Sequence, residues 1–191
     1  RDFNINSIAI ELPQHKIIDL HDGIEGIKKK EFDFIHSKSV LEDPTRVIRA
    51  ARYAARLNFK MSSNGVEQIK STINTWPWEW QVGSPVDLVP SALGNRLRME
   101  MELLLKNEPW EVALKYLQDW GGLSLFDKRI QENTEWFSRI KSAKELKVDP
   151  LIALLAIAEN EENLASRFQL SSRQKKLLEE SSKTRLFTKR L

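Results

Sequence analysis

The sequence contains no cysteine, and this absence removes several classes of chemistry. Among its 191 residues none carries a thiol, so disulfides, zinc–thiolate sites and thiol catalysis are excluded. No stretch approaches the roughly 20 apolar residues that span a bilayer, and no signal-peptide pattern opens the chain, so no membrane partner is expected. The missing cysteine is compatible with a reducing compartment, and a cytoplasmic location is the expectation.

The composition is that of a globular protein with a real core, with 41% hydrophobic and 30% charged residues. The formal net charge is only +3, but the positive charge is unevenly placed. Residues 171–191 carry seven Lys or Arg against two Glu, and residues 46–56 are also basic. Local patches of this kind suit a polyanion. Solvated helix faces are the alternative explanation for the C-terminal patch.

The hydrophobic pattern divides the chain into a short β-containing part and a long helical part. Apolar runs at 8–12 and 16–20 flank a Pro13-Gln14-His15 turn and predict a hairpin, with a helical turn at 24–28 and a strand at 31–35. From residue 41 the period is helical throughout. Because the chain starts without Met and enters a strand-like segment at once, we expect a fragment of a longer protein. Helices are predicted at 42–57, 63–72, 90–106, 109–119, 131–146, 149–158, 160–168 and 171–182.

The predicted helix at 42–57 carries an unusual series of charges. Asp43, Arg46, Arg49, Arg52 and Arg56 recur every three or four residues, which places them on a slowly winding stripe of the helix. Small alanines between them let a ligand or another helix come close. Arginines without acids four residues away repel one another, which favours an external anion such as a phosphate. The alternative is that they pair with acids on neighbouring helices.

Three segments, in matching order and spacing, resemble motifs of one enzyme family. Residues 1–9 (RDFNINSIA) resemble R-D-F-T-x-N-A-I-A, and residues 17–27 (IIDLHDGIEGI) resemble I-D-P-F-G-G-x-x-D-L. Residues 42–57 (EDPTRVIRAARYAARL) resemble E-D-P-x-R-x-L-R-A-x-R-F-A-A-x-L. These are motifs of class II tRNA nucleotidyltransferases (CCA-adding enzymes) and bacterial poly(A) polymerases. The chain is similar to this family over about residues 1–62.

Two departures from the family pattern lie in the first two segments. Ser7 stands where alanine is usual, and the second segment has Leu20-His21-Asp22-Gly23 in place of Pro-Phe-Gly-Gly. His21 beside Asp22 could also suggest a metal-dependent phosphohydrolase. That chemistry needs further ligands, and none of the three histidines is suitably placed, so a turn is predicted here.

The resemblance implies a mostly α, α+β fold. It would be the C-terminal part of a polymerase-β-like nucleotidyltransferase head, followed by an all-helical neck and body. The implied divisions are residues 1–38 for the remainder of the head, 39–106 for the neck with nucleotide-base recognition, and 107–191 for an RNA-binding body.

The resemblance also implies that Asp43 and Arg46 read the base of the incoming nucleotide. Cytosine and adenine each present an amine donor beside a ring-nitrogen acceptor, which suit a carboxylate and a guanidinium respectively. Uracil and guanine present the reverse pattern. Each buried polar group left unpaired costs about 1–3 kcal/mol, which is enough for strong rejection without a template.

The remaining site residues follow from the same motifs. Arg49 and Arg52 are implied to contact the phosphates or to orient the base reader. Arg1 is suited to phosphate, Asp2 to the ribose 2′-OH, and Asn6 to holding its strand against the ribose.

The implied reaction is attack of an RNA 3′-OH on the α-phosphate of CTP or ATP, with pyrophosphate leaving. Two Mg²⁺ ions held by a D-x-D carboxylate pair drive it in the family, and that pair lies before the R-D-F motif. We therefore expect no catalytic or metal-binding residue in this chain, and no activity from it alone. The expected partners are the tRNA 3′ end, CTP, ATP and the missing N-terminal catalytic segment.

Alternatives remain within and outside the family. A poly(A) polymerase shares these motifs, and a non-catalytic helical RNA-binding module could retain the fold. In the C-terminal patch, Lys175, Lys176 and Arg185 are the predicted tRNA contacts. The six tryptophans are predicted to pack between helices rather than stack on bases, with Trp78 the best candidate for exposure.

Overall fold

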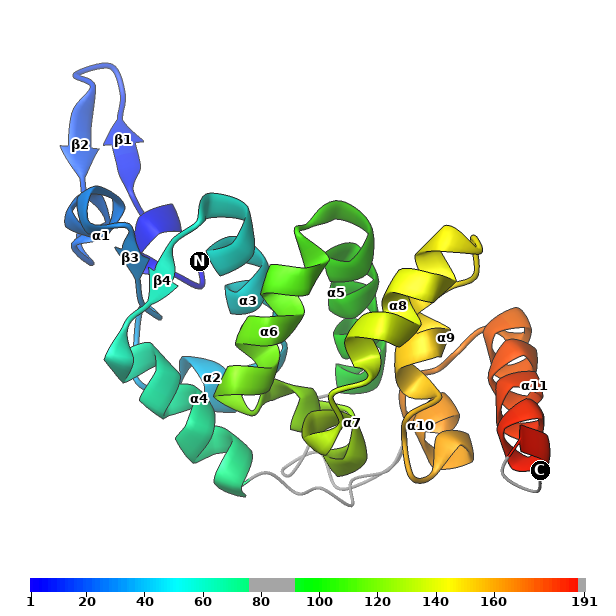
Figure 1. Cartoon of the computed structure of the whole chain (residues 1–191). Helices are drawn as coiled ribbons and strands as arrows, with labels where there is room; N and C mark the ends of the chain where they lie inside the picture. The colour runs from blue at the N-terminus through cyan, green and yellow to red at the C-terminus, as the bar shows by residue number, and fades with distance from the viewer. Residues whose placement is uncertain (76–91, 189–191) are drawn as a thin grey trace.

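The structure is a computed structural model that describes residues 1–75 and 92–188, with side chains up to residue 181 in the last helix. It is mostly helical, with two two-stranded sheets in the N-terminal part of the described chain, as the predicted fold class requires. Figure 1 shows the elements following one another from the β1–β2 hairpin at one end to α11 at the other. The bounds are η1 Asn4–Asn6, β1 Ala9–Glu11, β2 Lys16–Ile18, α1 Gly23–Lys29, β3 Glu31–Phe32, α2 Ser39–Glu42, α3 Thr45–Leu57, β4 Lys60–Met61, α4 Ser63–Thr75, α5 Leu93–Asn107, α6 Trp110–Trp120, η2 Gly122–Leu125, α7 Lys128–Glu132, α8 Trp136–Glu145, α9 Pro150–Leu155, α10 Glu161–Arg167 and α11 Ser172–Thr188.

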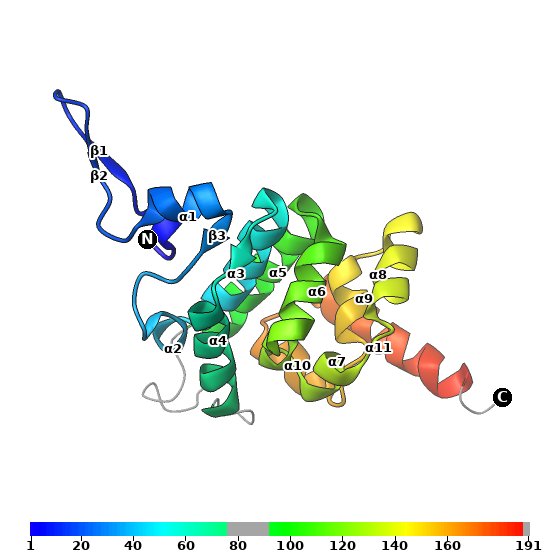
Figure 2. The ribbon, with the colours of Figure 1, turned by 60° about the vertical axis from the view of Figure 1, so that its left-hand side comes forward.

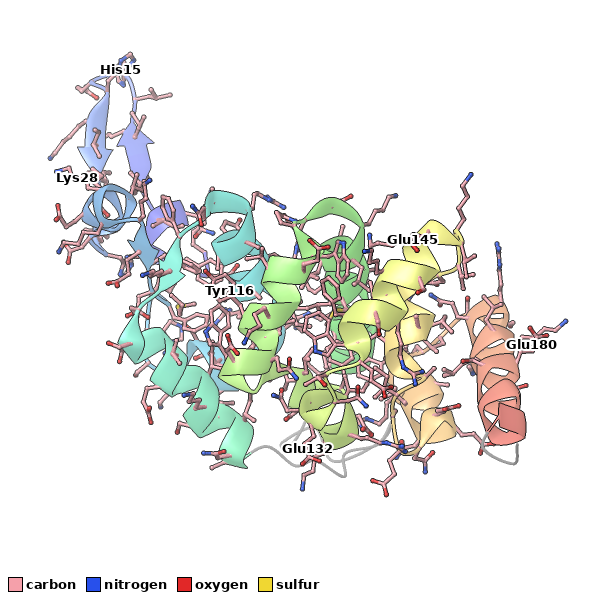
Figure 3. All side chains as sticks on the ribbon, in the orientation of Figure 1. His15, Lys28, Tyr116, Glu132, Glu145 and Glu180 are labelled. Carbon is pink, nitrogen blue, oxygen red and sulfur yellow. The ribbon has the colours of Figure 1, made fainter. Side chains whose placement is uncertain are left out.

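The predicted hairpin is confirmed, and it projects away from the helices (Figure 2). β1 and β2 are antiparallel with Ile10 opposite Ile17, and His15 lies at the tip of the projection (Figure 3). The apolar residues of the hairpin are not covered by other described elements, since Ile10 is 61% and Ile17 56% exposed. An isolated two-stranded hairpin with uncovered apolar residues is only marginally stable in water.

The turn predicted at His21 and Asp22 leads directly into α1. The Asp19 carboxylate accepts hydrogen bonds from the Gly23 and Ile24 amides at 2.8 and 2.9 Å. These amides are at the free N-terminal end of α1, where helix N–H groups lack partners inside the helix. The bonds from Ile24 and Gly23 hold the pKa of Asp19 below its ordinary value.

The second sheet corrects the expectation that no strand follows residue 41. β3 pairs in parallel with β4, with Phe32 opposite Met61, and β3 is shorter than the strand predicted at 31–35. The Lys60 amide donates to the Lys30 carbonyl at 2.9 Å. A two-residue ladder is too short to leave an alternating pattern, and its partner is 29 positions away in sequence. Only the tertiary fold reveals it.

The predicted helix at 42–57 is divided at its start. Glu42 ends α2, Asp43 is extended (φ −148°, ψ 91°), and α3 begins at Thr45. The division follows from the Asp43 carboxylate, which accepts hydrogen bonds from the Thr45 amide at 3.2 Å and from its hydroxyl at 2.6 Å. The predicted end is confirmed, since Asn58 follows Leu57 in the left-handed region at φ 52°.

α3 packs against α5 and α6 at the centre of the molecule. Ala50, Ala51 and Ala54 are fully buried there, and their small side chains let the neighbouring helices approach. Farther along, α8 packs on α9, and α11 packs on α9 and α10. One hydrophobic cluster runs from Phe3 to Leu178 through all of these layers. None of the described helices has the length and apolar character to cross a bilayer.

The helix predicted at 131–146 is in fact two helices, α7 and α8. Asn133 separates them, because its side-chain oxygen accepts the Glu135 amide at 2.6 Å and replaces a helical bond. Tryptophans near this break pack as predicted. Trp120 and Trp136 are buried, and Tyr116, labelled in Figure 3, stacks on Trp120 at 5.2 Å.

Candidate functional site

The N-terminal motif is folded back onto α3 by its phenylalanine. Phe3 is fully buried, forms an isolated bridge with Phe34, and lies 5.2 Å from the Tyr53 ring. The side-chain oxygen of Asn6 accepts the Phe3 amide at 3.2 Å, which closes the turn around it. Burial of Phe3 therefore fixes the position of the preceding residue, Asp2.

The Asp2 carboxylate lies between two arginines of α3. Arg46 Nε is 3.2 Å from one oxygen, and an Arg49 terminal nitrogen is 2.6 Å from the other. The side chains are 10% exposed for Asp2, 17% for Arg46 and 33% for Arg49, so the cluster opens to solvent mainly at Arg49. Two motifs separated by more than 40 residues thus meet in one charged cluster.

Arg46 has further partners on α2. Its terminal nitrogen donates to the Ser39 carbonyl at 2.9 Å and lies 3.6 Å from the Glu42 carboxylate. Charge-assisted bonds of this kind hold a guanidinium in one orientation.

Asp43, the acidic member of the predicted base reader, has an additional partner that sequence reasoning missed. One of its oxygens accepts from Thr45, and the other forms a short ion pair with Arg96 of α5. The Asp43 side chain is 11% exposed and that of Arg96 43% exposed. Arg96 therefore covers the carboxylate from the solvent side. Nothing in the sequence pattern of 90–106 singled out this arginine, because only tertiary packing shows which face of α5 meets α3.

The two C-terminal arginines of the stripe pair with acids in α5 and directly after it. Arg52 contacts Glu100 and donates from Nε to Glu108 at 3.1 Å, and Arg56 donates from Nε to Glu108 at 2.9 Å. The interpretation in which arginines pair with acids on a neighbouring helix thus describes Arg52 and Arg56. The sequence held only a partial signal, since Glu100 lies in the predicted helix at 90–106 but Glu108 follows its predicted end.

Glu108 is the most enclosed carboxylate of this cluster, with a side chain that is 0% exposed. Burial alone raises the pKa of its carboxyl, but the hydrogen bonds from Arg56 and Arg52 outweigh burial and hold the pKa below the ordinary value. The same hydrogen bond raises the pKa of Arg56. The carboxylate is therefore charged at neutral pH and serves as a fixed anchor for both arginines.

These contacts form one alternating network of acids and bases. Arg49 lies 3.8 Å from Glu100, which connects the Asp2 cluster to the Glu108 cluster. The network joins the N-terminal motif, α3 and α5. Its chain of contacts runs through Asp2, Arg49, Glu100, Arg52, Glu108 and Arg56.

The other predicted contacts lie apart from this network. Arg1 is exposed, and Asn6 is half-buried with its side chain in the turn around Phe3. On α11, Lys175 and Lys176 are exposed, and Lys176 lies 4.0 Å from Glu180, which Figure 3 labels at the far end of the molecule. The side chain of Arg185 lies outside the described residues. So do Trp76, Trp78 and Trp80.

The described residues do not fit a metal ion. Within residues 1–75 and 92–181, no three His, Cys, Asp or Glu side chains come together as possible ligands. The acids closest to the predicted site, Asp2 and Asp43, are already bound by arginines. What this arrangement offers chemically is a set of oriented hydrogen-bond donors and acceptors.

Comparison with curated proteins finds tRNA nucleotidyltransferases. The chain is 29% identical over 143 residues to an A-adding tRNA nucleotidyltransferase of Aquifex aeolicus, covering 73% of this chain and 16% of that protein. It is 30% identical over 134 residues to a multifunctional CCA protein of Psychromonas ingrahamii, covering 69% and 30%. A CC-adding enzyme of Deinococcus radiodurans is 28% identical over 65% of this chain. The chain thus spans less than a third of these relatives.

Solved structures show the same fold. A Thermotoga maritima CCA-adding enzyme complexed with tRNA matches with a TM-score of 0.72 at 24% identity, over 96% of this chain and 47% of that one. A CCA-adding enzyme in complex with CTP matches with a TM-score of 0.71 at 23% identity, over 96% and 46%. No family model matches the sequence. The resemblance that the three motifs indicate is nevertheless confirmed, and the chain is homologous to the tRNA nucleotidyltransferases that add CCA, CC or A.

Proposed function

We propose that the protein takes part in template-independent addition of C and/or A to the 3′ end of tRNA from CTP and ATP. In this proposal the chain supplies base and ribose recognition together with RNA-binding helices. The observation that supports it best is the convergence of Asp2, Arg46 and Arg49 from separate motifs into one cluster that is partly open to solvent. Relatives that add CCA, CC or A support the reaction class.

Asp43 and Arg46 form the proposed base reader. They flank the start of α3 on one turn, and both are held by hydrogen bonds to neighbouring backbone or side chains. A fixed carboxylate accepts from the amine of cytosine or adenine, and a fixed guanidinium donates to the ring nitrogen. Arg96 occupies the carboxylate oxygen that the amine would use. Because its side chain is 43% exposed, we propose that a bound base displaces it.

The ribose and phosphate contacts are proposed for residues around the same cluster. Asp2 is proposed to accept a hydrogen bond from a ribose 2′-OH, and Asn6 holds the turn that follows Asp2. Arg1 is exposed and Arg49 is more exposed than Arg46 and Arg52, and we assign Arg1 and Arg49 to phosphate. Arg52 is bound by two carboxylates and is 13% exposed, which favours the role of orienting the base reader through Glu100.

Mg²⁺ bound by a D-x-D carboxylate pair is part of the proposal for the intact enzyme. We propose that an N-terminal catalytic segment supplies this pair, that this chain alone is inactive, and that the intact protein works in the cytoplasm. The uncovered hairpin, with Leu12 74% and Leu20 81% exposed, supports a neighbour at this end. We also propose that residues 1–38 belong to the head, residues 39–106 to the neck and residues 107–191 to the body.

The direct test uses the intact protein and a tRNA that lacks its 3′ CCA. Each of the four nucleoside triphosphates is offered separately, and the lengths of the products are read at single-nucleotide resolution. Addition limited to C and A supports the proposal. Long runs of A would indicate a poly(A) polymerase. Binding of the tRNA without any addition would indicate a non-catalytic RNA-binding module.

A further inference from the structure

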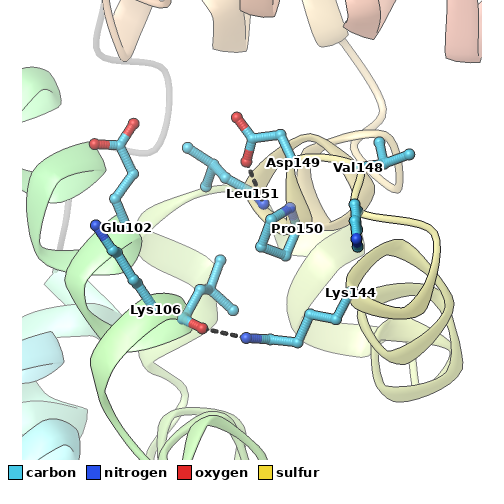
Figure 4. Close-up of a pocket in the computed structure, with 9 residues that line it drawn as sticks. Glu102, Lys106, Lys144, Val148, Asp149, Pro150 and Leu151 are labelled. Atoms are coloured by element: carbon cyan, nitrogen blue, oxygen red, sulfur yellow. Dashed lines mark hydrogen bonds between the residues drawn. The ribbon is translucent and has the colours of Figure 1, made fainter.

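Two adjoining cavities open on the side of the molecule between α5, α9 and α11. Each has a volume of about 550 Å³, and both are bounded by Lys147, Val148 and Asp149 in the turn between α8 and α9. Figure 4 shows the first cavity, in which Glu102 and Lys106 of α5 lie opposite Asp149. Arg173 lines the second cavity from α11. We call the two cavities together the α5–α11 groove.

The groove lies on a different face of α5 from the network described above. Residues 96 and 100 face α3, whereas residues 98, 102 and 106 line the groove. At about 100° per residue, Arg98 and Glu102 point roughly 120–160° away from Arg96 and Glu100, and Lys106 points roughly 80–120° away from them. The groove is therefore a surface separate from the proposed nucleotide site, connected to it by one rigid helix.

The charge of the groove is strongly one-sided. Its walls carry Arg98, Lys106, Lys144, Lys147 and Arg173, against two carboxylates. The whole chain has a formal net charge of only +3. A substantial part of its positive excess is thus gathered along these two cavities.

The two carboxylates are already used within the protein. Gln174 bridges them, donating to Glu102 and to Asp149 at 3.2 Å each. Glu102 also pairs with Arg98 at 3.0 Å, and Asp149 accepts the Leu151 amide at 3.0 Å at the start of α9 (Figure 4).

The cations divide into those with structural partners and those without. Arg98 pairs with Glu102, and Lys144 donates to the Leu105 carbonyl near the end of α5. Lys106, Lys147 and Arg173 are exposed and pair with no carboxylate among the described residues. They come from three different elements and line the same groove. Such an arrangement costs electrostatic repulsion unless a polyanion relieves it.

We propose that the α5–α11 groove binds the phosphodiester backbone of the RNA substrate through Lys106, Lys147 and Arg173. The inference rests on the proposed function for the choice of RNA as the polyanion. It adds a second contact surface, on a different face of α5 from the nucleotide site and distinct from the outward patch at Lys175 and Lys176. The groove contributes affinity and register along the backbone, since phosphate contacts carry no base information.

The test compares two triple charge reversals in the intact protein. The groove variant is K106E/K147E/R173E, and the matched control K16E/K70E/K128E reverses three exposed lysines of β2, α4 and α7. Affinity for tRNA lacking its 3′ CCA is measured across a series of salt concentrations, and CTP binding is measured in parallel. We expect the groove variant to lose affinity about 10- to 100-fold and the salt slope to fall by about 2–3, while CTP binding is unchanged.

Each other outcome has a defined meaning. Equal loss in the groove variant and the control would show a general charge effect and overturn the proposal. Unchanged tRNA affinity in the groove variant would overturn it as well. If the groove variant instead loses binding of poly-glutamate but not of RNA, the groove serves an acidic protein. Failure of the wild-type protein to select C and A would refute the proposed function and leave the groove measurement interpretable by itself. Circular dichroism and thermal unfolding of both variants check that they are folded.

Discussion

Arg52 and Arg56 of α3 have carboxylate partners at Glu100 and Glu108, whereas the three cations of the α5–α11 groove, Lys106, Lys147 and Arg173, pair with no carboxylate among the described residues. Paired charges in a half-buried interface fix the relative position of two helices. Unpaired charges along an open groove repel one another and are relieved only by something outside the chain. Arg52 and Arg56 thus hold two helices together, whereas in our proposal the three groove cations bind a ligand.

The largest expected effect on stability is at Glu108, which pairs with both Arg52 and Arg56. Glu108→Gln removes the negative charge between Arg52 and Arg56 while keeping the shape of the side chain. Breaking a buried pair by removing one partner costs about 3–5 kcal/mol, so we expect a loss of that order in the free energy of unfolding, measured in urea. The matched control is Glu135→Gln, whose carboxylate is 61% exposed and pairs with Arg139 four residues away. It should cost about 0.3–0.5 kcal/mol. Equal effects of the two substitutions would contradict the account.

The pH dependence of the unfolding free energy tests the role of Glu108 in a second way. The pKa of Glu108 in the folded protein lies below its ordinary value of 4.5, so the folded state is stabilised above that pH. This stabilisation is lost as the pH falls through the lower folded-state pKa. We expect the difference in unfolding free energy between the wild type and Glu108→Gln to be constant near neutral pH and to shrink in acid. A difference that does not change between pH 7 and pH 3 would show that Glu108 is not the anchor.

The smallest expected effect on folding lies at the C-terminal patch. Reversal of charge at Lys175, Lys176 and Arg185 should change the free energy of unfolding by no more than about 0.5 kcal/mol, because the two described lysines are exposed. It should still weaken tRNA binding and lower its salt slope. Unchanged tRNA affinity would refute the predicted contact, and a larger loss than that of the groove variant would make α11 the main RNA surface.

The parts of the fold that the sequence predicts are those set by local chemistry. The hairpin around Pro13, the end of α3 at Asn58 and most helices follow from periodicity and turn residues. The features that the sequence does not predict depend on contacts that only the folded structure shows. β4 depends on a pairing with β3, and the break before α3 depends on how Asp43 binds Thr45.

The candidate site shows the same division. The family resemblance assigns Asp2 and the α3 arginines to one nucleotide site, and in the structure Asp2 contacts Arg46 and Arg49. Arg96 was not predicted, because pairing across α3 and α5 depends on the rotation of each helix about its axis. For the same reason the choice between an external anion and neighbouring acids could not be made from sequence. The structure shows the acids for Arg52 and Arg56.

The most direct test of the proposed base reader compares ATP with purine riboside triphosphate, which lacks only the exocyclic amine. The intact protein adds each to a tRNA ending in CC, and the ratio of the two kcat/KM values is determined for the wild type and for Asp43→Ala, which has no acceptor at this position. If the Asp43 carboxylate accepts from the amine, the wild-type ratio should be about 10–100 and should collapse toward one in the variant. A ratio that is the same in both proteins would show that Asp43 does not read the base.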